Sequence, residues 1–263
     1  MMNRELSLTL AGRPAPRRFG SVALAVYNAL YWPYLLVSCA ALFFPALLLF
    51  VVTAPFDRKR RWLHTYTALW GAHYLAWAPF AGVSVRGRER AQHGPYVFVS
   101  NHQSMVDILA VFATRLPFLW VSKIENFYVP FLGWNMLFNG YVRLRRGHLP
   151  SIMRMVRTCL ARLRAGHSLF IFPEGTRSPT GDLIPFYAGA FRIAARTGVP
   201  VVPVVLHGTR DILPKRSFRI HPRRVTIEIL EPITAEQAGG DWRKLRDVVR
   251  DRMQAEIERL RSA

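Results

Sequence analysis

The feature that most constrains this chain is an apolar stretch, residues 19–56, in which no side chain is charged. Arg18 and Asp57 bound it, and it is longer than the apolar core of a cleavable signal peptide. Its densest part, residues 35–54, is long enough to span a bilayer, for which about 20 apolar residues suffice. We therefore expect residues 1–82 to form a basic N-terminus and a membrane-anchoring helical segment.

The path of this segment through the membrane is open to two interpretations. Pro33 and Pro45 predict a broken or kinked helix. Basic residues flank the stretch on both sides, at 17–18 and 58–61, so charge bias assigns no orientation to a single span. A re-entrant helix pair that bends at the prolines would instead keep both flanks on the cytoplasmic face. The aromatic-rich residues 62–85 then read as an interfacial helix.

The charge of the chain restricts its partners to anionic molecules. The net charge is +20 and the sequence pI about 11.2, which favours nucleic acid, anionic lipid headgroups or phosphorylated substrates. A nucleic-acid-binding protein has no use for the uncharged stretch, and no recognised binding motif is present. We therefore expect membrane phospholipids among the partners, and no nucleic acid.

From about residue 83 the pattern changes to short apolar runs that alternate with helical periodicity, which predicts an α/β catalytic domain over residues 83–263. The predicted strands are 96–100, 117–121, 168–172, 201–206 and a half-exposed 225–230, and the predicted amphipathic helices cover 152–163 and 242–260.

The first candidate site is a polar loop between a predicted strand and a helix that begins near Ser104. It carries His102, followed five residues later by Asp107. Asp107 at capping-box spacing from Ser104 is explained by helix capping alone. The functional interpretation is that Asp107 holds His102 in one tautomer, so that the other ring nitrogen accepts a proton from an attacking hydroxyl.

Two further segments are suited to binding an anion. Residues 173–178 read Pro-Glu-Gly-Thr-Arg-Ser after an apolar strand, where backbone amides near Gly175, the Thr176 hydroxyl and the Arg177 guanidinium can surround a phosphate. A surface ion pair between Glu174 and Arg177 is the alternative. The other segment is a strand end with three arginines, Arg143, Arg145 and Arg146, which is either an anion site or a solvated basic rim.

Together these segments resemble the ordered sequence blocks of the glycerophospholipid acyltransferase family, in particular its 1-acyl-sn-glycerol-3-phosphate acyltransferases. The resemblance covers roughly residues 80–230. Its blocks are Asn101-His102-x4-Asp107, Gly140–Arg146, Phe172–Arg177 and Val199–Pro203, and Lys123-x-Glu125 resembles a segment between the first two. The resemblance implies a mixed sheet flanked by helices. The second block is the least faithful, because arginines surround Arg146.

The resemblance also implies roles for individual residues. His102 would be the general base and Asp107 the residue that orients it. Arg146, Glu174, Gly175, Thr176 and Arg177 would form the glycerol-phosphate site, and Lys123 is a candidate for stabilising the oxyanion.

The expected reaction moves an acyl group from acyl carrier protein or coenzyme A to the sn-2 hydroxyl of 1-acyl-glycerol-3-phosphate, on a catalytic domain that faces the cytoplasm at a bacterial inner membrane. No covalent acyl-enzyme, metal or bound cofactor is expected. Another lysolipid acceptor remains open, among them lyso-ornithine lipid, lysophosphatidylinositol and glycerol-3-phosphate. So does a non-catalytic membrane-anchored scaffold.

Overall fold

The computed structural model of the protein describes residues 20–76 and 82–262, and within them one seven-stranded sheet has the order β1-β7-β6-β2-β5-β3-β4. The strands are β1 (Val83–Arg86), β2 (Val97–Ser100), β3 (Leu119–Lys123), β4 (Val142–Leu144), β5 (Leu169–Ile171), β6 (Val201–His207) and β7 (Val225–Ile229). Neighbouring strands are parallel except β6 and β7, which pair antiparallel. The predicted mixed α/β sheet is thus confirmed.

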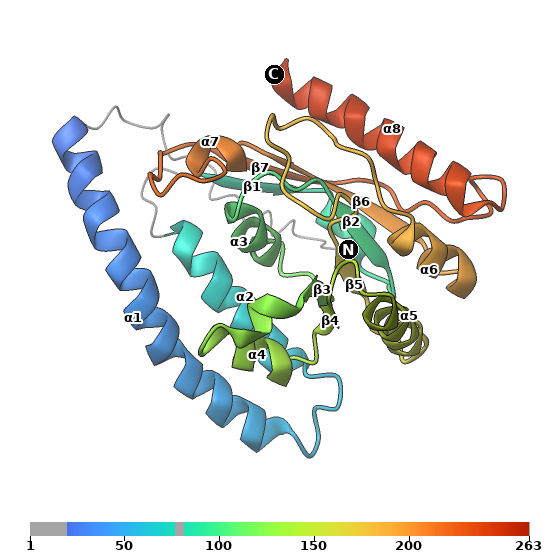
Figure 1. The fold of residues 1–263 in the computed structure, drawn as a ribbon, viewed down its shortest axis with the longest axis horizontal. Helices are drawn as coiled ribbons and strands as arrows, with labels where there is room; N and C mark the ends of the chain where they lie inside the picture. Colours follow the sequence, from blue (N-terminus) through green and yellow to red (C-terminus); the bar gives the residue numbers. More distant parts are fainter. Residues whose placement is uncertain (1–19, 77–81, 263) are drawn as a thin grey trace, which may run out of the picture.

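Helices cover both faces of the sheet (Figure 1). They are α1 (Ser21–Thr53), α2 (Arg61–Ala76), α3 (Val106–Ala113), α4 (Leu132–Phe138), α5 (Leu149–Arg164), α6 (Gly189–Thr197), α7 (Thr209–Ile212) and α8 (Trp242–Arg261), with short 3-10 helices η1 (Arg88–Ala91) and η2 (Ile124–Tyr128). Helices α5, α6 and α8 lie on one side, and α1 to α4 lie on the other.

The central strands form because runs of apolar residues are buried on both of their faces, as is typical of parallel sheets between helical layers. Every residue of β2 is buried. In β6 only His207, at the end of the strand, is partly exposed. The prediction of a half-exposed strand at 225–230 is wrong: β7 lies between β1 and β6, and four of its five residues are buried, including Glu228.

Residues 21–53 of the uncharged stretch form one continuous helix that includes Pro33 and Pro45, so the helix is not broken at either proline. Proline removes a backbone hydrogen bond, but an apolar helix that is packed along its length tolerates this loss. That packing is aromatic: Phe43 lies 5.5 Å from the Trp134 ring and 5.9 Å from Phe138. The chain reverses instead at residues 54–60, after which α2 runs back beside α1.

In the segment 62–85, predicted as an interfacial helix, residues 77–81 lie outside the described residues and 83–85 belong to β1. The first part of the segment forms helix α2, whose position at a membrane stays a prediction. It packs against α1 and α3, and its buried residues include Leu63, Trp70 and Tyr74. The other face of α2 is exposed and carries Trp62 and Leu69.

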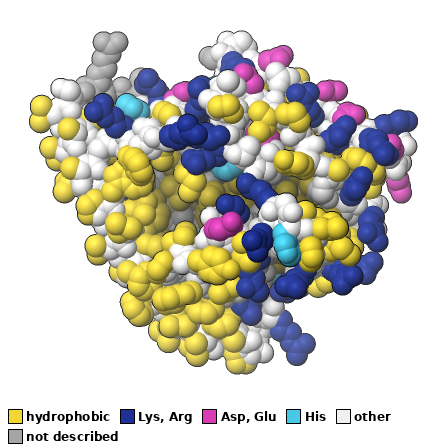
Figure 2. Space-filling model, viewed as in Figure 1, with side chains coloured by type: hydrophobic (Ala, Val, Ile, Leu, Met, Phe, Trp, Pro, Cys, Tyr) yellow, Lys and Arg dark blue, Asp and Glu magenta, His cyan; other side chains and the backbone are white. Residues whose placement is uncertain are grey.

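Helix α1 carries the apolar surface of the protein. It is the one helix of the described residues that is long and apolar enough to cross a membrane, with a mean hydropathy of 2.7. Large apolar side chains on its outer face are exposed, among them Leu30, Val37 and Leu48. Figure 2 shows the hydrophobic side chains gathered over this part of the molecule, whereas Lys and Arg side chains crowd the opposite side.

Candidate active site

The predicted site residues lie beyond the carboxyl ends of parallel strands, the edge at which open α/β sheets bind ligands. Strand β2 ends at Ser100, two residues before His102, and β5 ends at Ile171, three residues before Glu174. These strands are neighbours in the sheet, with Val99 in register with Ile171. The loops that follow them are therefore brought together, and Ser178 donates a backbone hydrogen bond of 2.7 Å to the carbonyl of His102.

The predicted pairing of His102 and Asp107 is present. The Nδ1 atom of His102 lies 2.8 Å from Oδ2 of Asp107, whose side chain is fully buried. The same oxygen accepts the backbone N–H groups of Gln103 at 2.6 Å and of Ser104 at 2.8 Å. The predicted contact is therefore present together with a capping bond to the Ser104 N–H, whereas the role of His102 as a proton acceptor stays a prediction.

This geometry assigns the histidine tautomer. A carboxylate oxygen that already accepts two N–H donors is an acceptor for the third contact as well, so Nδ1 of His102 carries the proton. Its Nε2 is then the basic nitrogen. The imidazole side chain as a whole is 14% exposed.

An aromatic stack that the residue pattern did not predict supports the imidazole. The rings of His102 and Phe172 are stacked at 4.1 Å with 14° between their planes, and Trp120 stacks behind Phe172 at 5.4 Å. Trp120 lies in β3 and Phe172 directly follows β5, and both strands are on the same side of β2. The sequence feature that could have indicated this stack is the position of Phe172 directly before the Pro-Glu-Gly-Thr-Arg segment.

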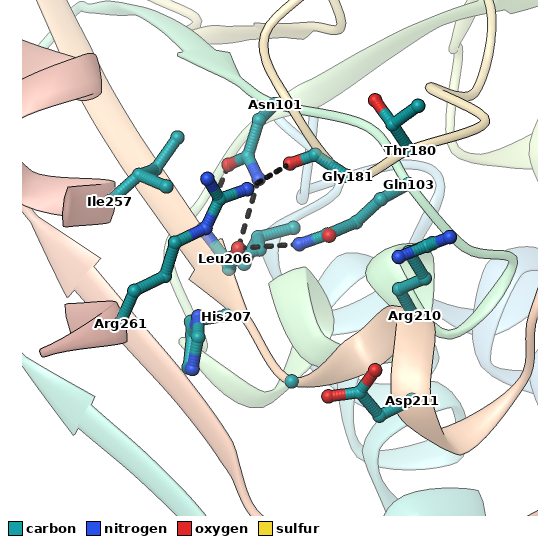
Figure 3. A pocket seen from close by; sticks show the side chains of 11 residues that line it. Asn101, Gln103, Thr180, Gly181, Leu206, His207, Arg210, Asp211, Ile257 and Arg261 are labelled. Atoms are coloured by element: carbon teal, nitrogen blue, oxygen red, sulfur yellow. Dashed lines mark hydrogen bonds between the residues drawn. The ribbon is translucent and has the colours of Figure 1, made fainter.

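Asn101 and Gln103, on either side of His102, connect its loop to β6 by hydrogen bonds. The sequence did not predict this role either. Asn101 donates to the Leu206 carbonyl at 2.9 Å and accepts from its N–H at 2.9 Å. Gln103 donates to the same carbonyl at 2.7 Å. Both side chains line a pocket of about 100 Å³, to which His102 does not contribute (Figure 3). Its Arg261 is already bound to Asp182 and to the Gly181 carbonyl.

Glu174 is not at the surface of the site but beneath it. Its side chain is only 2% exposed, and neither of its carboxyl oxygens has a hydrogen-bond partner among the described residues. Burial raises the pKa of Glu174 to about 8, an effect that the backbone of His102 opposes and Asp107 reinforces. At neutral pH this carboxyl is largely protonated, and the alternative of a surface ion pair with Arg177 is wrong.

The other residues of this segment lie nearer to solvent. Gly175 has a φ of +65°, a conformation that favours glycine, and a Cβ here would lie 2.7 Å from the Tyr187 ring. Thr176 is exposed and Arg177 partly exposed. The Arg177 carbonyl accepts a hydrogen bond from Lys215, whereas its guanidinium makes no hydrogen bond or ion pair within the described residues.

The predicted basic residues of β3 and β4 form a separate cluster at the edge of the sheet. Lys123 pairs with Glu125 at 3.1 Å, and both are about half exposed. The pKa of Glu125 is lowered by its own backbone N–H, by Lys123 and by Arg145. Arg146 lies in the exposed turn after β4. No contact in the described structure joins these residues to His102, so the structure brings His102, Asp107 and Glu174 together, but not Lys123 or Arg146.

Comparisons with known proteins assign this chain to a family. A family model described as Acyltransferase matches residues 82–207, which include all the predicted site residues. A putative 1-acyl-sn-glycerol-3-phosphate acyltransferase of Caenorhabditis elegans is 35% identical over 204 residues, 74% of this chain and 72% of that protein. The chain belongs to the acyltransferase family.

Other members of the acyltransferase family show the same relationship. A chloroplastic 1-acyl-sn-glycerol-3-phosphate acyltransferase of Brassica napus is 40% identical over 187 residues, which is 70% of this chain but 54% of that longer protein. The chain thus spans about half the length of this relative. The crystal structure of the LPA acyltransferase PlsC from Thermotoga maritima matches with a TM-score of 0.74 and 26% identity, over 92% of this chain and 96% of that one.

Proposed function

We propose that the protein transfers a fatty acyl group from an acyl thioester to the sn-2 hydroxyl of 1-acyl-glycerol-3-phosphate, which forms phosphatidic acid. The observation that carries the proposal is the buried pairing of Asp107 with His102, on a loop held at the carboxyl edge of the sheet. Relatives named for this activity cover the same region of the chain. The donor is acyl carrier protein or coenzyme A, carrying the acyl thioester.

In this proposal His102 is the general base. Its Nε2 takes the proton of the acceptor hydroxyl as the oxygen attacks the thioester carbonyl, and Asp107 stabilises the resulting imidazolium. When the carbon–sulfur bond breaks, the same proton passes to the departing thiolate. The three hydrogen bonds to Asp107 and the ring stack with Phe172 hold the imidazole in place, so little reorganisation is needed at the moment of reaction.

The acceptor phosphate is proposed to bind at residues 175–177. The guanidinium of Arg177 has no partner among the described residues and is partly exposed, so it is free to bind a phosphate. Gly175 and Thr176 form the turn beside it. Glu174 is buried and does not reach solvent, so we assign it a positioning role beneath the loop; because it is largely neutral, it does not repel the phosphate.

The roles proposed for Lys123 and Arg146 depend on how far the bound substrate extends. Both are exposed, and neither contacts the His102 loop. Arg146 can bind part of a long substrate that extends from His102 along the edges of β3 and β4. Lys123 can stabilise the oxyanion only if its side chain reaches the thioester carbonyl beside His102, where the oxyanion forms. A substrate confined to the His102 loop would leave both outside the site.

The membrane part of the proposal rests on α1. Its exposed apolar side chains would be costly to leave in water, at about 25 cal/mol per Å². The lysolipid acceptor keeps its tail in the leaflet, while the donor thioester is soluble. We therefore propose that α1 is embedded in the bacterial inner membrane and that the sheet domain faces the cytoplasm.

The test is His102→Ala, assayed with several lysophospholipids and both donors, with products identified by mass spectrometry. Loss of a general base lowers the rate by about 100- to 10,000-fold. His93→Ala is the matched control, because His93 is exposed and outside the site. Near-normal turnover of a folded His102→Ala protein would contradict the mechanism. No product from wild type with any acceptor would favour the non-catalytic scaffold.

A further inference from the structure

A second pocket lies at the opposite edge of the sheet, where the strands begin. It has a volume of about 130 Å³ and lies beneath the turn between α1 and α2. Its walls come from that turn, from α2 and from residues at the starts of β2, β3 and β5, and include Lys59, Arg60, Arg61, Tyr96, Leu119 and Ser168.

This pocket is separate from the candidate active site. Tyr96 directly precedes β2, and His102 follows the end of the same strand. The four residues of β2 between them span roughly 13 Å at about 3.3 Å per residue. A small ligand in the pocket therefore cannot touch His102.

Positive charge is concentrated around this pocket. A Cβ built on Gly166 would lie 3.0 Å from Nζ of Lys59, so Lys59 is close to the end of α5. The pKa of His167 is lowered by burial and then by Arg162, Lys59 and Arg61. The pKa of Arg60 is likewise lowered by burial and by Arg162, and only Asp57 opposes this.

These cations lack acidic partners. Within the described residues, Lys59, Arg60, Arg61 and Arg162 form no ion pair of 4 Å or less. The nearby Asp57 carboxylate accepts the backbone N–H of Trp62. Like charges that are gathered in this way repel each other unless an anion lies between them.

Capping of α5 does not account for the cluster. Cations often collect at a helix C-terminus to bind its last carbonyls. Here the carbonyls of Ala161, Arg162 and Leu163 already accept the backbone N–H groups of Ala165, His167 and Gly166. The cationic side chains are therefore available to a ligand.

We propose that the pocket beneath the α1–α2 turn is a second phosphate site, which takes the phosphate of an anionic lipid headgroup. Apolar side chains beside the pocket are exposed to solvent: Phe56 in this turn is 67% exposed, and Trp62 in the first turn of α2 is 64% exposed. Exposed aromatic residues next to cations are typical of segments at the membrane–water interface. A headgroup phosphate bound among Lys59, Arg61 and His167 would leave its acyl chains beside Phe56 and the end of α1.

The experiment uses the purified full-length protein in neutral detergent micelles, titrated calorimetrically with phosphatidylglycerol and, separately, with inorganic phosphate. Lys59→Gln/Arg61→Gln should weaken lipid binding by more than about tenfold, because two charge-assisted contacts are lost. The matched control is Arg58→Gln/Arg164→Gln, which removes the same charge from exposed positions outside the pocket lining. It should weaken binding by less than about threefold.

Two more variants distinguish binding at this pocket from a loss of folding and from binding at residues 175–177. Lys59→Arg/Arg61→Lys keeps the charge and should keep binding, which excludes loss of folding as the cause. Arg177→Ala should leave phosphatidylglycerol binding unchanged, so failure of the proposed acceptor site and failure of this one are distinguishable. Equal weakening by both double Gln variants, or no lipid binding by wild type, would overturn the proposal. Inorganic phosphate bound as tightly as the lipid would overturn the lipid assignment.

Discussion

Replacing Glu174 with Gln removes a carboxyl that is buried beneath the catalytic loop without a hydrogen-bond partner among the described residues. The pKa of this carboxyl in the folded protein is about 8, against an ordinary value of 4.5. Between these two pH values the unfolded chain has released the proton and the folded chain has kept it. The unfolded state therefore binds fewer protons, and the free energy of unfolding falls as the pH rises.

The size of the effect follows from this pH window. Each pH unit between about 4.5 and 8 lowers the free energy of unfolding by about 1.4 kcal/mol, so the ceiling is about 5 kcal/mol. Local relaxation and water entry reduce this, and we expect about 2 to 5 kcal/mol. The contribution is fully present below pH 4.5 and is lost by about pH 8. Gln at this position does not titrate, so the free energy of unfolding of the Gln variant lacks this decrease with pH.

The assay compares thermal unfolding of wild type and Glu174→Gln in one detergent from pH 5 to pH 9. Histidines and other groups titrate in both proteins, so the difference between the two curves isolates Glu174. As the pH rises, the Gln variant should become more stable relative to wild type. Glu236→Gln, at an exposed carboxylate, should run parallel to wild type. Parallel curves for Glu174→Gln as well would show that this carboxyl ionises normally.

Two other predictions concern the acceptor and the membrane. Arg177→Ala should raise the KM for the lysophosphatidate by about 10- to 100-fold and that for the donor much less, since a charge-assisted bond is worth about 1.5–3 kcal/mol; equal effects in steady-state kinetics would make Arg177 structural. Cysteines introduced at Arg13 and Lys59 should both resist a membrane-impermeant thiol reagent added to intact cells, if both flanks of α1 are cytoplasmic. Labelling at position 13 alone would instead support a single span, and labelling at both would place both flanks outside.

Much of the sheet was predictable because its strands are short, apolar and separated by turns. The predicted strands at 96–100 and 201–206 correspond to β2 and β6, and the predicted helix 242–260 corresponds to α8. The burial of β7 was not predictable, since an alternating pattern does not reveal a neighbouring strand added on the outside. Here β1 pairs with its edge, and α3 and η1, which precede it by more than a hundred residues, pack against it.

The membrane segment shows where local rules fail. Pro33 and Pro45 predict a broken or kinked helix from the local sequence alone. The continuity of α1 depends on its packing against α2 and α4, which a short stretch of sequence does not reveal. Arg13, Arg17 and Arg18 lie outside the described residues, so the basic N-terminus stays a prediction. The domain boundary after residue 82 also stays a prediction.

At the site, residue spacing predicted the contact of His102 with Asp107 but not the environment of Glu174. The contact is local, because both residues lie on one loop and the first turn of a helix. The burial of Glu174 depends on elements far along the chain: α8 brings Arg250 close enough to affect its pKa. The sequence motif therefore identifies the segment that contains Glu174, whereas the fold determines whether its carboxyl group is ionised.

The protonation of Glu174 matters because of its position next to the His102–Asp107 pair. Two buried carboxylates close together repel each other, and the one with fewer hydrogen bonds retains its proton. Asp107 accepts three donors on one oxygen, whereas among the described residues only the backbone of His102 acts on Glu174, without forming a full hydrogen bond. The loop therefore carries one negative charge beside His102.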